Sequence, residues 1–175
     1  TAIVGFISVP LLLGYYGKAE YGILSIATAC NGYMHLLDLG MNVGAVKFFS
    51  QWKAEGNIDK VYRVARTNIT FYGIIALINI AGLLLLAFWG KSFFSITDLQ
   101  FVTLQKCLIV IALFSILSWG ATTFNQLLIA DKQMSFTMQM QCVTGLLKGL
   151  LVACVFWFDW SLLTYFFSLT AVISL

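Results

Sequence analysis

Polar side chains recur at helical spacing inside an apolar stretch near the start of the chain. They are Asn31, His35, Asp38 and Asn42. Separations of four, three and four positions put these residues on one face of a helix. A charge at the centre of a membrane-spanning helix costs about 2.5–3.5 kcal/mol even on insertion scales, so such a residue usually has a function in transport. Asp38, together with His35, is therefore the candidate for coupling to H⁺ or Na⁺.

A second polar stripe lies further along the chain and contains a cation. Its members are Gln133, Thr137, Gln141, Thr144 and Lys148. Their separations of four, four, three and four positions again indicate one helical face. The apolar stretch before this stripe ends in further polar residues, namely Thr122, Thr123, Asn125 and Gln126. Membrane helices turn polar faces toward each other or toward a wet cavity, so the pattern predicts a bundle with a hydrophilic interior.

Packing is the alternative explanation for each of these residues. A polar side chain in a span often only joins two helices, with a hydrogen bond worth about 1 kcal/mol. This role fits four of them, taken singly, as well as a functional one does: Asn31, Asn42, Gln141 and Thr144. For Asp38 and Lys148 the alternative is an ion pair that only holds the bundle together. Gly40 and Gly44 permit either close helix packing or a bend beside Asp38.

Motifs for catalysis, metal binding and cofactor binding are missing from the sequence. His35 has no Cys, Glu or second His at ligand spacing, and no phosphate loop, nucleophile elbow or HExxH pattern is present. The four cysteines have no CxxC spacing, so we expect small buried hydrophobes: Cys30, Cys107, Cys142 and Cys154. We therefore expect a protein that is not an enzyme and binds no metal or cofactor.

The elements that position the polar residues follow from composition. The chain is 61% hydrophobic and 10% charged, with a mean hydropathy of +0.93. A soluble domain carries roughly 25% charged residues, so lipid must cover most of this surface. A spanning helix needs about 20 apolar residues. The pattern predicts an all-α, polytopic transmembrane bundle with six spans, at residues 1–16, 21–46, 69–89, 107–130, 133–158 and 160–175.

The outer spans are short, and both ends of the chain look cut. We therefore expect residues 1–175 to be one transmembrane lobe of a longer protein. The links also differ in charge, because Lys53, Lys60, Arg63 and Arg66 lie in 51–67, Lys47 precedes them and Lys132 follows the fourth span. Basic residues mark the cytoplasmic side, which predicts a cytoplasmic N-terminus. Residues 51–67 form either a solvated loop or an amphipathic helix at the inner leaflet.

An ordered set of short motifs runs through residues 8–50. Its members are Pro10, Leu11, Leu12, Gly17, Tyr21, Gly22, Asp38, Leu39, Gly40 and Ala45. With the sequence NQLLIADK at 125–132, they resemble the N-terminal part of bacterial polysaccharide flippases of the multidrug/oligosaccharidyl-lipid/polysaccharide exporter superfamily. The resemblance implies two six-helix lobes around a central cavity that opens alternately to each side of the bacterial inner membrane.

The resemblance also implies the cargo and the partners. The cargo would be a polyprenyl-pyrophosphate-linked oligosaccharide for O-antigen, capsule or exopolysaccharide synthesis. The polysaccharide polymerase machinery would be a partner besides the phospholipid bilayer, and nucleic acid would not. Lys148 and Lys47 would attract the pyrophosphate. The remaining expected lining residues are Asn31, Tyr33, Asn42, Gln141 and Thr144.

Other functions stay open at this stage. A cation-coupled multidrug exporter of the same superfamily would prefer acidic residues in its cavity, and Lys148 counts against it. A membrane-embedded glycan polymerase or ligase tends to carry a large extramembrane loop, whereas the predicted links are short. A purely structural membrane subunit would leave both stripes as packing contacts.

Overall fold

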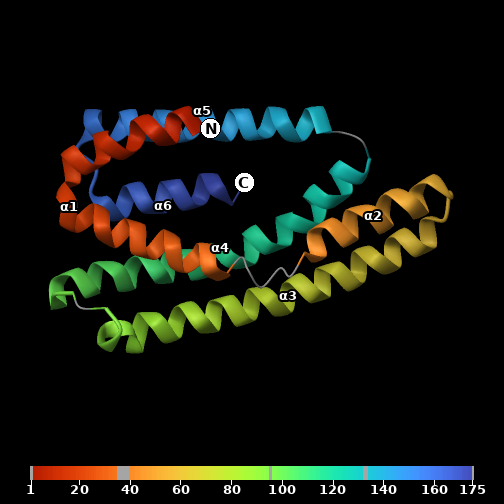
Figure 1. Ribbon diagram of the computed structural model, residues 1–175, viewed down its shortest axis with the longest axis horizontal. Coiled ribbons are helices and arrows are strands. Elements are labelled where there is room, and N and C mark those ends of the chain that lie inside the picture. The colour runs from red at the N-terminus through yellow and green to blue at the C-terminus, as the bar shows by residue number, and fades with distance from the viewer. Residues whose placement is uncertain (1, 35–39, 95, 132–133, 175) are drawn as a thin grey trace.

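The computed structural model describes residues 2–34, 40–94, 96–131 and 134–174 (Figure 1). These residues form α-helices and one 3₁₀ helix, and no strand occurs among them. The helices are α1 (Ala2–Met34), α2 (Met41–Ala54), α3 (Ile58–Trp89), η2 (Gly90–Ser92), α4 (Asp98–Ala130), α5 (Met134–Phe158) and α6 (Leu162–Ile173). The predicted all-α bundle is confirmed.

Helix α1 consists of two arms that meet at Gly17. This residue has φ 79° and ψ 168°, a conformation that only glycine adopts readily. The first arm runs to one end of the bundle, and the second arm returns from that end (Figure 1). The break between the spans predicted at 1–16 and 21–46 is therefore reduced to a single residue.

The predicted single helix over 21–46 is wrong. The second arm of α1 ends at Met34, and α2 begins only at Met41. Gly40, which precedes α2, has φ 77° and lies in the left-handed region, so a right-handed helix cannot continue through it. Asn31 and Asn42 consequently lie on different helices, and the face that they were predicted to share does not exist. His35 and Asp38 lie outside the described residues.

Helices α2 and α3 form a hairpin where a long link was predicted. Helix α2 extends to Ala54, and α3 begins at Ile58, where the Asn57 side chain accepts a hydrogen bond of 3.3 Å from the Lys60 backbone N–H. Residues 51–67 are thus neither a solvated loop nor a separate helix. At 1.5 Å per residue, the 32 residues of α3 span about 48 Å, more than the roughly 30 Å of a bilayer core. Its charged first turns therefore extend beyond the hydrocarbon.

Three helices are long and apolar enough to cross a membrane among the residues that are described. They are α3, α4 and residues 135–158 of α5, whereas α6 is apolar but has only 12 residues. Helix α4 is central, since it contacts each of the other five α-helices. Its core-facing side includes Leu104, Cys107 and Leu108, all fully buried. The chain is a helical membrane protein.

The cysteines differ in exposure, contrary to the prediction that all four are buried. Cys107 is buried in the core, Cys30 and Cys154 are half-buried, and Cys142 is exposed. All four are free thiols. Cys142 is exposed because few other helices cover the first half of α5, where most side chains are open.

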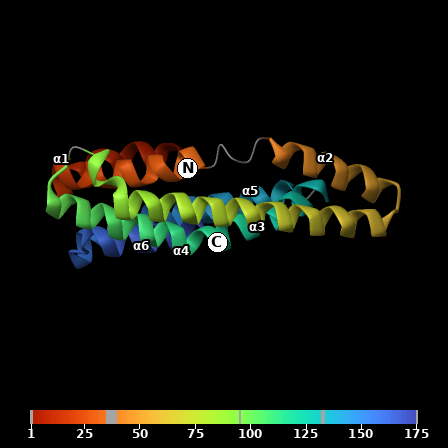
Figure 2. The same cartoon turned by 90° about the horizontal axis from the view of Figure 1, so that it is seen from below.

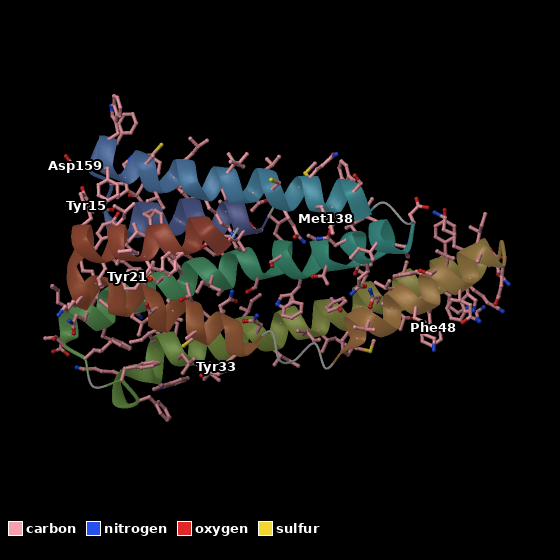
Figure 3. All side chains as sticks on the ribbon, turned by 45° about the horizontal axis from the view of Figure 1, so that its top comes forward. Tyr15, Tyr21, Tyr33, Phe48, Met138 and Asp159 are labelled. Atoms are coloured by element: carbon pink, nitrogen blue, oxygen red, sulfur yellow. The ribbon has the colours of Figure 1, made fainter. Side chains whose placement is uncertain are left out.

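The turns collect at two ends of the bundle (Figures 1 and 2). The bend between the two arms of α1, the α3–α4 link and the α5–α6 turn lie at one end, and the α2–α3 turn and the C-terminal end of α4 lie at the other. At the first end, the Tyr15 hydroxyl donates to Asp159 Oδ1 at 2.7 Å, and the Tyr16 hydroxyl donates to the Trp160 carbonyl at 2.8 Å. Figure 3 shows Tyr15 beside Asp159. This grouping of the links agrees with the grouping expected from their charges.

Candidate functional site

A cavity of about 310 Å³ lies between the two arms of α1, α5 and α6. We call it the α1–α5–α6 cavity. Apolar residues of all three helices line part of it, including Leu12, Val152 and Leu169. Its polar lining consists of Ser8, Tyr21, Ser25, Thr28, Lys148 and Tyr165. A hydroxyl-rich cavity inside an apolar bundle offers a polar solute an alternative to lipid.

Lys148 is the charged residue among the described lining of this cavity. It lies on α5 within the segment that is apolar enough to cross a membrane, and it is half-buried. No carboxylate among the described residues forms an ion pair with it. Its ammonium group therefore supplies positive charge to the cavity, and among the described members of the second stripe Lys148 alone is in the lining. That stripe lies on one continuous helix from Thr137 to Lys148.

The second arm of α1 contributes the hydroxyls. Tyr21, Ser25 and Thr28 are separated by four and three positions and face the same cavity. Ser25 donates to the Tyr21 carbonyl, and Thr28 donates to the carbonyls of Leu24 and Ser25, each at 3.0 Å. Because both hydroxyl protons are used within the helix, the oxygens remain as acceptors toward the cavity. Sequence reasoning missed this face, although its spacing is visible in the sequence.

Asn31 lies one turn further along the same arm and lines a much smaller cavity. This space of about 30 Å³ lies between α1, α4 and α6 and shares Ile173 with the larger one. Its other polar lining residues are Ser115, Ser118, Thr170 and Ser174. The volume suits a single water molecule with several polar partners. Asn31 thus lines a separate, small polar cavity that borders the α1–α5–α6 cavity at the apolar residue Ile173.

The remaining predicted lining residues are not brought to the α1–α5–α6 cavity. Tyr33 is 71% exposed, and Lys47 and Gln141 are also exposed. Thr144 is half-buried and donates to the Met140 carbonyl of its own helix at 2.8 Å. The side chain of Asn42 lies outside the described part of the chain, as do His35 and Asp38. Figure 3 marks Tyr21, which lines the cavity, and Tyr33, which does not.

A separate polar network joins α3 to α4. Asn68 Nδ2 donates to Gln126 Oε1 and, at 3.4 Å, to Thr123 Oγ1, while Gln126 Nε2 donates to the Tyr72 hydroxyl at 2.8 Å. Asn68, Thr123 and Gln126 are at most 2% exposed. Two residues from the polar end of the fourth span, Thr123 and Gln126, therefore hold α3 and α4 together and do not line the α1–α5–α6 cavity.

Asn79 is a second buried amide on α3. Its side chain is fully buried, and neither amide atom has a hydrogen-bond partner among the described residues. A buried amide without a partner costs about 1–3 kcal/mol. Neither Asn68 nor Asn79 was singled out from the sequence, because an isolated Asn carries no positional signal.

Together the fold and the cavity define a class, an α-helical membrane protein with a partly open cavity that is lined by apolar side chains, hydroxyl groups and a lysine. No protein-family model, curated protein or solved structure matches the chain. The assignment to this class therefore rests on the apolar helices and on the cavity that contains Lys148.

Proposed function

We propose that the chain is one lobe of a transporter that moves a polyprenyl-pyrophosphate-linked oligosaccharide across the bacterial inner membrane by alternating access. The observation that carries the proposal is the position of Lys148, which faces a cavity lined by hydroxyl groups within an apolar bundle. The resemblance over residues 8–50 supplies the substrate class. The product would serve O-antigen, capsule or exopolysaccharide synthesis.

The physical task is to carry an anionic, polar head group through apolar lipid. Transfer of a polar group without compensating hydrogen bonds costs roughly 2–7 kcal/mol, and transfer of an isolated charge costs far more. Lys148 would form charge-assisted hydrogen bonds with the pyrophosphate oxygens. The hydroxyl oxygens of Ser25 and Thr28 would accept hydrogen bonds from sugar hydroxyls, since their own protons are used within α1.

The cavity volume limits what this lobe holds by itself. About 310 Å³ is at the lower end of small-molecule sites, so it would accommodate the pyrophosphate and the adjoining sugar. The rest of the glycan would lie between this lobe and a second one. Rocking of one lobe against the other would change the side to which the cavity opens. Asp38, with His35, is the proposed site of coupling to H⁺ or Na⁺.

The charge of the cavity favours this cargo over the alternatives. A cation-coupled multidrug exporter would need an acidic residue to attract a cationic drug, whereas the described lining contains Lys148 and no carboxylate. A glycan polymerase or ligase would need catalytic groups near the sugar. Ser25 and Thr28, which line the cavity with Lys148, donate their hydroxyl protons within their own helix, and this supports a binding role for them.

The test compares flipping rates of the full-length protein at equal membrane abundance. Lys148→Ala should lower the rate about 10-fold to 100-fold, because a hydrogen bond to a charged group is worth about 1.5–3 kcal/mol. Lys148→Arg should retain most of the rate. Lys106→Ala removes an exposed lysine of α4 and should leave the rate unchanged. Asp38→Ala should slow transport through loss of coupling, and wild-type rates in both Lys148→Ala and Asp38→Ala would exclude these residue roles.

A further inference from the structure

A larger groove opens at the opposite end of the bundle, near the α2–α3 turn. It has a volume of about 510 Å³ and lies between α2, α3 and α4. We call it the α2–α3–α4 groove. Its apolar wall includes Phe49, Ile58, Tyr62, Phe124, Leu127 and Leu128. Lys53 and Asp131 also line it and form an ion pair with each other.

The apolar wall is open to the surroundings. Ile58 is 66% exposed, Tyr62 is 71% exposed and Phe124 is 65% exposed. Ile58 and Tyr62 lie in the charged first turns of α3, beyond the part of the helix that fits the hydrocarbon core. An apolar groove at the membrane surface is suited to the acyl chain of a lipid. Contact with the chain would remove the apolar side chains from water, which stabilises by about 25 cal/mol per Å² of apolar area.

Positive charge surrounds the groove. The basic residues that the structure describes at this end are all exposed, and they are Lys47, Lys53, Lys60, Arg63 and Arg66. Among the described residues, only Lys53 of this set forms an ion pair. The carboxylates of the same end are fewer, namely Glu55, Asp59 and Asp131. Clusters of basic residues next to a spanning helix attract anionic lipids, at about 1 kcal/mol for each Lys or Arg near the surface.

We propose that the α2–α3–α4 groove binds one anionic phospholipid. An acyl chain lies along Ile58, Tyr62 and Phe124, and the phosphate is held at Lys53. The ion pair between Lys53 and Asp131 does not oppose this binding, because its side chains are 54% and 41% exposed and such pairs contribute about 0–1 kcal/mol. The lipid would link α2 to α3 and α4 at the membrane surface. This site is independent of the cargo proposed above.

The test counts the lipids that remain on the protein. The purified full chain is placed in nanodiscs of phosphatidylcholine mixed with phosphatidylglycerol. The protein is then released from the nanodiscs in the mass spectrometer, and the lipids that remain bound are identified by native mass spectrometry. One phosphatidylglycerol molecule should be retained in preference to phosphatidylcholine. Lys53→Ala should reduce that preference about fivefold. Leu128→Trp, which fills the groove, should remove the retained lipid altogether.

Lys91→Ala is the matched control. Lys91 is also an exposed lysine in an ion pair, with Asp98 at 2.6 Å, but it lies at the other end of the bundle. The Lys91→Ala variant should retain phosphatidylglycerol as the wild-type protein does. Because Lys53 is exposed, its substitution leaves the core intact even if Leu128→Trp fails to fold. Equal retention of both phospholipids by the wild type would overturn the proposal. Two other results would also overturn the proposal. One is displacement of the lipid by inorganic phosphate, and the other is a protein dimer that occupies the groove instead of a lipid.

Discussion

Polar side chains in this bundle divide into two kinds according to what they face. Lys148, Ser25 and Thr28 face a cavity, whereas Asn68 and Gln126 face each other across α3 and α4. The first kind leaves acceptors and a positive charge available to a solute. The second kind forms hydrogen bonds within the protein, and only the Asn68 Oδ1 atom of this pair is left without a partner among the described residues. Burial and partner geometry distinguish the two roles, although both begin as polar residues in apolar sequence.

Substitution of Gln126 should show that the polar network between α3 and α4 stabilises the fold. Gln126→Ala removes two buried hydrogen bonds, one accepted from Asn68 Nδ2 and one donated to the Tyr72 hydroxyl. We expect a loss of about 1–3 kcal/mol in the free energy of unfolding. Asn125→Ala changes the exposed neighbouring residue and should have almost no effect. Unfolding in detergent checks both, and equal stability of the two variants would contradict the role of the network.

Glycines in unusual conformations set the course of the helices. Gly17 reverses the chain between the two arms of α1, and Gly40 precedes α2 in the left-handed region. The reversal at Gly17 allows two antiparallel arms to line one cavity with α5 and α6. Hydrogen bonds from Tyr15 and Tyr16 to residues 159 and 160 hold this reversal against the α5–α6 turn.

The contribution of Gly17 is measurable against a neighbouring glycine. Gly17→Ala should destabilise the protein by about 1–3 kcal/mol, since the conformation at φ 79° is strained for a residue with a Cβ. Gly14→Ala lies three residues earlier in helical backbone, with no atom within 4 Å of an added Cβ. It should be neutral or stabilise by about 0.5–1 kcal/mol. A melting temperature for Gly17→Ala at or above that of the wild type would exclude a strained turn.

The whole molecule has two chemically different ends. The α2–α3 turn is surrounded by exposed basic side chains, whereas the end with the Gly17 reversal and the α5–α6 turn has fewer. Long helices such as α3 separate the ends by more than the thickness of a bilayer core. The unequal charge predicts that the α2–α3 turn lies in the cytoplasm.

Cysteine labelling of intact cells checks this orientation. In a variant in which the exposed Cys142 is replaced by Ser, Lys91→Cys should react with a membrane-impermeant maleimide added from outside. Glu55→Cys, at the other end, should react only after the cells are made permeable. The reverse labelling pattern would place the basic end outside and would contradict the predicted cytoplasmic position of the α2–α3 turn.

Local properties of the sequence were sufficient for much of the architecture. Hydropathy predicts helices throughout, because lipid requires every backbone group to bond within its own segment. The stripe from Thr137 to Lys148 was predicted on one helix, since its period of about 3.6 residues is a property of a continuous helix alone. Lys148 was also predicted to face a cavity, as a cation in an apolar helix has few other stable positions.

Tertiary structure decided which polar residues act together. The stripe through Asn31 and Asn42 failed because Gly40 adopts a left-handed conformation, which helical periodicity does not anticipate. The partnership of Asn68 with Gln126, and the cavity shared by Ser25 and Lys148, join helices that are distant in sequence. The sequence by itself therefore determined the helices and the presence of a half-buried cation within one of them. Only the packing of the helices decided which hydroxyls surround that cation, because neighbours in space depend on contacts between elements and not on spacing within one.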